Sequence, residues 1–312
     1  MKKLLIAVFC FFSLSAFADC AYPCKPITII IPNGPGSASD VAARRIGESI
    51  KEHLHQDYQL EFIPGANGVV GTRKLLDSKP DGYTIMLSRA AIDVYNPVMR
   101  NNLGYNTLTD FTDIGVTFKF PMSVIVNPKG KNNTYQTLTT AAQLNAGSST
   151  HGGILLIKRM GKHYRNDIVA APYNTPDATR NNLAGQHLDF IVETVFPAIN
   201  AHRQGLVQIV GVASHERLPA LPNVPTLREL GYPVEQWGFL SLRGPKGMDP
   251  AVVAKLNDVL NRAMKERAYQ AQLIADGMYT PANNQPSDLT KLIVSEFGAW
   301  DAVRQQEKIA RE

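Results

Sequence analysis

The stretch 27–45 constrains the fold more than any other part of the chain. Its first five residues, 27–31, are all β-branched, which is typical of a strand covered on both faces. Two prolines and two glycines follow within 32–36 and force irregular backbone. Helical spacing of apolar residues then begins, with Ser37 or Ser39 as the start of the helix. A buried strand that a glycine loop joins to a helix predicts an α/β fold.

The start of this helix is a candidate anion site. The first N–H groups of a helix have no intrahelical partner, and the helix dipole is positive there. Two readings stay open: an anion seat, or a tight turn in which the serines only cap the helix and the acidic residue favours the dipole. The candidate ligand residues of this loop are Asn33, Gly34, Gly36, Ser37, Ser39 and Asp40.

A second strand–loop–helix unit follows the first. Residues 60–63 predict a short strand, 64–68 a second glycine loop, and 69–78 a helix, before a third strand at 83–87. Such alternation indicates a parallel sheet with helices on both faces, and ligands bind beyond the carboxyl ends of its strands. The candidate residues there are Ala66, Asn67, Gly68 and Arg89.

Arg89 has two interpretations. Its guanidinium could clamp a carboxylate with two parallel hydrogen bonds. It could instead be a surface arginine or a partner of Asp93, four residues further on.

The second region of the chain repeats this alternation of strands, polar loops and helices. Two apolar runs within 111–126, split at 119–121, indicate a crossover into a second domain. The elements that we expect after it are a helix at 135–144, a loop at 147–153 that opens a helix at 154–160, strands at 168–170 and 207–212, a helix through Leu183, a return strand at 237–242, and helices from 249 and 288.

This order predicts two domains, 22–122 plus 232–312 and 123–231, with a hinge near 120–124 and 230–238. The candidate ligand residues of the second domain lie near the expected starts of its helices and the expected ends of its strands. They are Ser148, Ser149, Thr150, His151, Tyr173, Asn174 and Glu193.

Glu193 is open to two interpretations: it could bind an ammonium group of the ligand, or neutralise Arg89.

The N-terminus has the pattern of a secretory signal. Residues 1–18 combine two lysines, an apolar run and a small-residue site, so we expect cleavage after Ala18 and a periplasmic location. In that oxidising compartment Cys20 and Cys24 could form a disulfide, or they could remain two thiols. Their spacing without further Cys or His ligands is poor evidence for a metal site.

Length, composition and charge limit the kinds of partner that we expect for this chain. The chain of 312 residues is long enough for about two domains. The formal charge is +5, and removal of Lys2 and Lys3 with the signal leaves +3. Because the mature chain has no dense basic run, nucleic acid is not an expected partner. We also expect a monomer without cofactors.

Several segments, taken in order, resemble one family: the periplasmic receptors of tripartite tricarboxylate transporters, also called Bug receptors. The matching segments are KPITIIIP (25–32), PGANGVVG (64–71), PDGYT (80–84), GSSTH (147–151), LAGQHLD (183–189) and RLPALPNVPT (217–226). The resemblance implies a two-lobed, type II periplasmic-binding-protein-like fold with a sheet in each lobe. It also implies a small organic acid or amino-acid-like ligand between closing lobes, with its carboxylate at the first two loops, and delivery to the membrane components of a transporter.

The chain departs from the family pattern in the predicted cleft. It has Asn33 where an aromatic residue is usual, Arg89 where small polar residues are usual, and Glu193 where aspartate is frequent. A secreted hydrolase that uses Ser148 or Ser149 with His151 is the alternative. We expect no catalysis, because no Gly-x-Ser-x-Gly elbow is present and triad members normally come from separate segments.

Overall fold

The computed structural model describes residues 21–35, 37–173, 175–281, 284–306 and 310–311. The predicted signal peptide, the Cys20 half of the predicted disulfide, and the predicted contacts of Gly36 and Asn174 lie outside this part.

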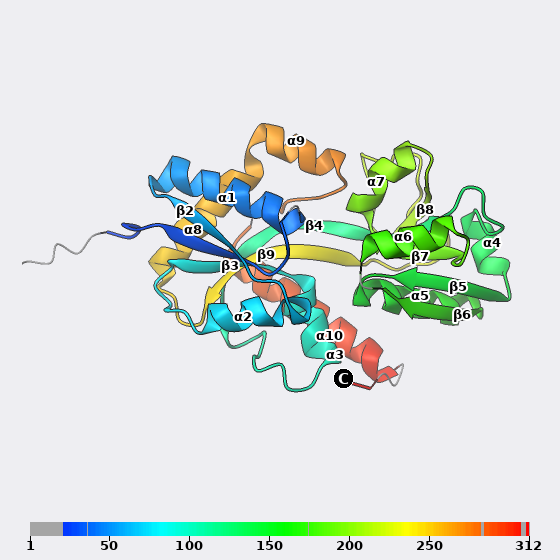
Figure 1. Ribbon diagram of the computed structural model, residues 1–312, viewed down its shortest axis with the longest axis horizontal. Helices are drawn as coiled ribbons and strands as arrows, with labels where there is room; N and C mark the ends of the chain where they lie inside the picture. The colour runs from blue at the N-terminus through cyan, green and yellow to red at the C-terminus, as the bar shows by residue number, and fades with distance from the viewer. Residues whose placement is uncertain (1–20, 36, 174, 282–283, 307–309, 312) are drawn as a thin grey trace, which may run out of the picture.

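Strands and helices alternate through most of the chain (Figure 1). The first half contains β1 (Ile27–Ile31), α1 (Ala38–Leu54), β2 (Tyr58–Phe62), η1 (Ala66–Gly68), α2 (Val69–Leu76), β3 (Thr84–Arg89), η2 (Ala91–Tyr95), α3 (Asn96–Met99), β4 (Phe111–Val126), α4 (Tyr135–Thr140) and β5 (Gln143–Ser148). The second half contains α5 (His151–Tyr164), β6 (Asp167–Pro172), α6 (Pro176–Ala184), β7 (Phe190–Thr194), α7 (Val195–Arg203), β8 (Gln208–Val212), β9 (Trp237–Pro245), α8 (Pro250–Lys265), α9 (Arg267–Ala275) and α10 (Pro286–Gln306).

The strands follow the order β2-β1-β3-β9-β4-β7-β5-β6, and β8 also pairs with β4. β1 is parallel to β2 and β3, as expected, whereas β9 returns antiparallel between β3 and β4. The long strand β4 pairs with β9 through Phe111–Pro121 and with β7 through Met122–Val126. One strand therefore belongs to the sheets of both halves, which lie side by side in Figure 1.

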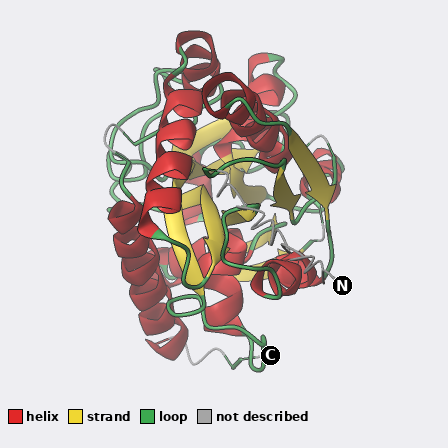
Figure 2. Cartoon of the chain, turned by 90° about the vertical axis from the view of Figure 1, so that its left-hand side faces the viewer, coloured by secondary structure: helices red, strands yellow, loops and turns green. Residues whose placement is uncertain are grey.

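Each half has its own hydrophobic core. In the first, Ile27, Ile29 and Ile31 pack with apolar residues of α1 and α8, so the β-branched run is buried as predicted. In the second, Val124 and Phe190 pack with apolar residues of α5. Helices cover the strands from both sides (Figure 2). The predicted two-lobed α/β fold is confirmed.

The predicted helix at 135–144 is wrong in its second half. Helix α4 ends at Thr140, and Gln143–Ser148 forms strand β5. Buried Leu144 and Ala146 alternate with exposed residues, and the strand is held by parallel pairing with β6 and β7. That stability comes from distant segments, which local periodicity does not show.

The crossover expected within 111–126 lies where it was predicted, as one continuous strand. Pro121 lies inside β4, paired with Trp237 at the point where β4 passes from one sheet to the other. A proline is tolerated there because ladder hydrogen bonding changes partner at this position.

Candidate functional site

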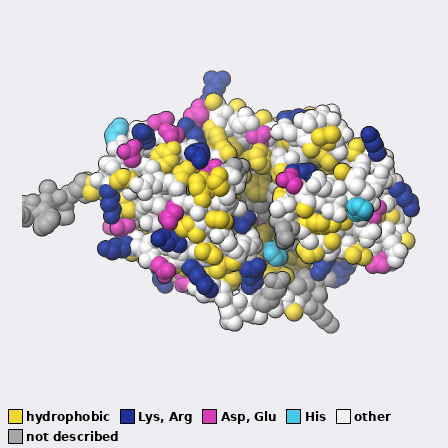
Figure 3. All heavy atoms as spheres, viewed as in Figure 1, with side chains coloured by type: hydrophobic (Ala, Val, Ile, Leu, Met, Phe, Trp, Pro, Cys, Tyr) yellow, Lys and Arg dark blue, Asp and Glu magenta, His cyan; other side chains and the backbone are white. Residues whose placement is uncertain are grey.

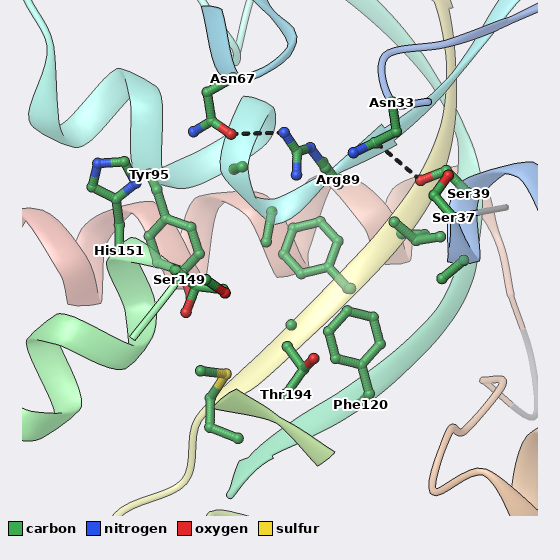
Figure 4. A pocket seen from close by; sticks show the side chains of 18 of the residues that line it. Asn33, Ser37, Ser39, Asn67, Arg89, Tyr95, Phe120, Ser149, His151 and Thr194 are labelled. Atoms are coloured by element: carbon green, nitrogen blue, oxygen red, sulfur yellow. Dashed lines mark hydrogen bonds between the residues drawn. The ribbon is translucent and has the colours of Figure 1, made fainter. Parts of the chain in front are cut away.

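A cleft of about 550 Å³ lies between the lobes. Figure 3 shows the surface hollowed in this place, and Figure 4 shows the side chains that line it. They come from the starts of α1 and α5, the loop before α2, the end of β3, η2, and the middle of β4 and β9. The lining residues are Asn33, Ser37, Ala38, Ser39, Asn67, Arg89, Ala90, Ala91, Tyr95, Arg100, Phe120, Met122, Ser149, Thr150, His151, Tyr173, Thr194, Gly238, Phe239 and Leu240.

The start of α1 faces this cleft. Ser37 is the N-cap, and its hydroxyl accepts the N–H of Asp40 at 3.2 Å. The hydroxyl of Ser39 donates to Oδ1 of Asn33 at 3.3 Å. These serines therefore cap and order the loop while they line the cleft. Asp40 points elsewhere and forms an ion pair of 2.8 Å with Arg44; like Gly34, it is not part of the lining.

The second glycine loop has an unusual backbone. Gly65, Ala66, Asn67 and Gly68 all have positive φ, at 137°, 45°, 56° and 95°. Asn67 tolerates this conformation better than most side chains do. Its Nδ2 donates to Oδ1 of Asn96 at 3.0 Å, and Nδ2 of Asn96 donates to its carbonyl at 3.2 Å. The loop thereby presents Asn67 to the cleft, whereas Ala66 and Gly68 are outside the lining.

Arg89 ends β3 and points into the cleft (Figure 4). One Nη donates to Oδ1 of Asn67 at 2.7 Å, and its buried Nε has no hydrogen-bond partner. Burial lowers the pKa of Arg89, but an arginine remains charged at neutral pH. In the part of the chain that the structure describes, no carboxylate lies within ion-pair distance of it. Among the residues that the structure describes, Arg89 is therefore a cleft cation without a carboxylate counter-ion.

The alternative pairing of Arg89 with Asp93 is wrong. Asp93 is fully buried, and its carboxylate accepts from Arg243 at 2.9 Å, Ser88 at 2.6 Å and Ser241 at 2.7 Å. The Asp93 oxygens are therefore occupied by these donors, and Asp93 is not part of the cleft lining.

The start of α5 faces the cleft from the second lobe. Thr150 is its N-cap and accepts the N–H of Gly153 at 3.0 Å. Ser149, Thr150 and His151 line the cleft, as does Tyr173. Ser148 is fully buried outside the lining, where its hydroxyl is hydrogen-bonded to that of Thr150 at 3.2 Å.

Glu193 occupies a different position from the one expected. It is 2% exposed and does not line the cleft. Its Oε1 accepts the backbone N–H of Ser149 at 2.7 Å and its Oε2 accepts the Ser149 hydroxyl at 2.7 Å. Thr179 adds a hydroxyl at 2.9 Å. Burial raises the pKa of Glu193, and these hydrogen bonds oppose that effect. It neither touches the cleft directly nor pairs with Arg89.

Several lining residues were not predicted. Phe120 and Met122 belong to the part of β4 that crosses between lobes, Thr194 ends β7, and Phe239 lies on β9. The crossover signal at 111–126 could have pointed to the first two, because a strand that joins two lobes must pass the cleft. Tyr95 gives no such signal, since its place depends on packing against Trp300, 5.3 Å away between ring centroids.

The two serines of the alternative hydrolase have other partners. The hydroxyl of Ser148 pairs with Thr150, and that of Ser149 donates to Glu193. A serine nucleophile needs a histidine base in hydrogen-bond contact, and the geometry gives neither serine one. Among the described residues there is also no cluster of acidic, Cys and His side chains suited to a metal ion.

Comparison with known proteins defines the class first. The periplasmic binding protein BugD is 25% identical in sequence, with a TM-score of 0.80 over 93% of this chain and 100% of BugD. MatC of Rhodopseudomonas palustris, solved with bound malate, is 23% identical, with a TM-score of 0.78 over 90% of this chain and 99% of MatC. A second R. palustris protein, solved with adipate, is 22% identical, with a TM-score of 0.83 over 93% of this chain and 100% of that chain. The chain has the two-lobed fold of periplasmic solute-binding proteins.

Sequence comparison then defines the family. BugT of Bordetella pertussis (strain Tohama I) is 29% identical over 297 residues, which cover 90% of this chain and 89% of BugT. Residues 42–309 match the family described as "Tripartite tricarboxylate transporter family receptor". The chain belongs to this family of solute-binding receptors. No helix in the described residues has the length and apolar character needed to cross a membrane.

Proposed function

We propose that this protein is a periplasmic receptor that captures a small carboxylate between its lobes and delivers it to the membrane components of a tripartite tricarboxylate-type transporter. Arg89 carries the proposal. Its guanidinium lines the cleft with a buried, unpartnered Nε, and no carboxylate of the described residues neutralises it. A partly buried cation is stabilised by a counter-charge, and a ligand carboxylate supplies it with charge-assisted hydrogen bonds.

The surroundings of Arg89 support the same chemistry. The N-terminus of α1 lies in the same cleft, where Ala38 and Ser39 provide first-turn N–H groups and the positive end of a helix of 17 residues. Relatives with the same fold were solved with malate and with adipate, which are both carboxylates.

The remaining parts of this proposal follow from the sequence. Residues 1–18 act as a cleaved signal, the mature protein is a monomer, and it performs no catalysis. The lobes are 22–122 plus 232–312 and 123–231, and they close about 120–124 and 230–238. Ligand binding shifts the population towards a closed form, since a ligand that touches both lobes binds that form best.

Ligand identification tests the proposal. The protein is purified from the periplasm of the cells that produce it and is then denatured. The released small molecules are identified by mass spectrometry. We expect a carboxylic acid at one molecule per chain, and calorimetry with that acid should give one-to-one binding without turnover. Turnover of an ester or amide that is lost in Ser148→Ala or Ser149→Ala would support the hydrolase instead.

A further inference from the structure

The two ends of the cleft differ in their hydrogen-bonding chemistry. The first-lobe end offers donors: the guanidinium of Arg89 and the first N–H groups of α1. The second lobe contributes Ser149, Thr150, His151, Tyr173 and Thr194 to the lining, and Figure 4 shows Ser149 and His151 at the start of α5. What Ser149 can offer a ligand depends on Glu193 behind it.

Both polar hydrogens of Ser149 already form hydrogen bonds within the protein. Its backbone N–H donates to Oε1 of Glu193 and its hydroxyl donates to Oε2, each at 2.7 Å. A hydroxyl has one hydrogen and two acceptor sites. Ser149 Oγ therefore faces the cleft as an acceptor only, and its N–H cannot hold an anion as a free helix-start amide would.

The arrangement around Glu193 is that of an ionised carboxylate. Besides Ser149, the hydroxyl of Thr179 approaches Oε1 at 2.9 Å, sharing its hydrogen with the carbonyl of Pro176. Arg180 on α6 acts on it electrostatically in the same sense, although that arginine is also paired with Asp177. Donors converge on both oxygens, and these hydrogen bonds favour the charged form against the burial that raises the pKa of Glu193.

We propose that the ligand carries one carboxylate, bound at the Arg89 end, and a hydrogen-bond donor at its other end, a hydroxyl or an ammonium group, bound by Ser149. The proposal rests on the proposed function and names the ligand class of the same cleft. A second carboxylate at Ser149 would meet acceptor lone pairs instead of a donor. It would also stand within roughly 5.5 Å of Glu193, the sum of two hydrogen-bond lengths, where like charges repel.

The lining also has apolar side chains, which fit an apolar spacer in the ligand. Phe120, Met122 and Phe239 are among the lining residues, and Figure 4 shows the ring of Phe120. The expected ligands are thus ω-hydroxy or ω-amino acids with an apolar body, as opposed to dicarboxylates of equal length.

Matched ligands test this inference. Calorimetry compares linear acids of four to eight carbons in three forms: the dicarboxylate, the ω-hydroxy acid and the ω-amino acid. At the best-fitting length, we expect the hydroxy or amino acid to bind at least about tenfold more tightly than the dicarboxylate, the factor that one mismatched buried polar group costs.

Glu193→Gln should reverse this preference. The amide keeps the shape of the side chain and removes its charge. With its oxygen towards the Ser149 N–H, its NH₂ group donates to Ser149 Oγ, and the hydroxyl hydrogen turns to the cleft. We therefore expect the dicarboxylate to gain about tenfold relative to the hydroxy acid. Glu52→Gln, at an exposed site outside the cleft, should leave the ratio unchanged.

Ser149→Ala gives a second readout that does not depend on the buried carboxylate. It should lower hydroxy-acid affinity about tenfold and leave dicarboxylate affinity close to its wild-type value. The inference would be overturned if the wild-type protein bound the dicarboxylate more tightly at every length, or if Glu193→Gln did not change the affinity ratio. Either result would still agree with the proposal that the protein is a carboxylate receptor. Absence of binding by every acid would contradict the receptor proposal as well.

Discussion

At the scale of single residues, the site depends on how two side chains are held. Arg89 lies at the end of a buried strand and Asn67 in a left-handed turn, and one hydrogen bond of 2.7 Å joins them. Asn67 is itself fixed by two hydrogen bonds to Asn96. The guanidinium is therefore oriented by a neutral amide, which places it without cancelling its charge. Its remaining donors are left for a ligand.

Asn67→Asp tests this division between orientation and charge. Aspartate accepts the left-handed backbone and occupies the same volume, but its charge neutralises Arg89. We expect carboxylate affinity measured by calorimetry to fall about tenfold to a hundredfold. Loss of the Nδ2 hydrogen bond to Asn96 should also lower the free energy of unfolding by about 1 kcal/mol.

Asn67→Ser is the matched control, because it shortens the side chain and adds no charge. Its loss of affinity should be smaller than that of Asn67→Asp. Equal losses in the two variants would mean that orientation, and not neutralisation, explains the effect.

At the scale of elements, helix α10 packs against a residue that lines the cleft. Its Trp300 packs edge-on against Tyr95, a lining residue, and the Trp300 ring N–H donates to Glu296 one turn earlier at 3.1 Å. Burial raises the pKa of Glu296, although the Trp300 hydrogen bond and Lys119 oppose this. A helix that orders the site thus contains an acid that resists ionisation.

Glu296→Gln has a predictable pH dependence. A carboxyl whose folded pKa is raised contributes its full stability below its ordinary value near 4.5 and loses it as the pH rises through the folded pKa. Glutamine keeps the acceptor for Trp300 and does not ionise. Relative to wild type, we expect the variant to gain on the order of 1 kcal/mol of unfolding free energy between pH 4.5 and pH 8.

Urea titrations at the two pH values measure this gain, with exposed Glu52→Gln as the control whose difference from wild type stays constant. A gain that appears at the lower pH and vanishes at the higher one would contradict the assigned sign.

At the scale of the whole molecule, only part of this account could be predicted. The unit from β1 to α1 was predictable because its β-branched run, loop glycines and N-cap are local signals. Strand β5 was not, since pairing with β6 and β7 makes it a strand.

The residues of the site likewise divide into those with local sequence signals and those whose position depends on distant segments. Ser37, Ser39 and Asn67 were found from loop chemistry, and all three line the cleft. That no carboxylate of the described residues pairs with Arg89 could not be predicted, because its nearby candidate Asp93 is taken by Arg243, which is 150 positions further along the chain. The sequence likewise shows no sign that Glu193 lies behind Ser149.

Closure of the two lobes is the prediction that belongs to this scale. Strands β4 and β9 join the lobes, and Phe120 and Gly238 face each other where they pass the cleft. A ligand held at both ends should shift the population towards a compact form. We expect small-angle X-ray scattering to show a smaller radius of gyration at saturating ligand. An unchanged radius would show that the ligand binds without closure.

The central claim is that Arg89 binds the carboxylate, and calorimetry of Arg89→Gln with the copurified acid tests it most directly. Exposed Arg267→Gln, outside the cleft, is the charge-matched control. Removal of a partly buried, charged hydrogen-bond donor should raise the dissociation constant about a hundredfold in Arg89→Gln and leave it unchanged in Arg267→Gln. Wild-type affinity in a folded Arg89→Gln variant would contradict the account.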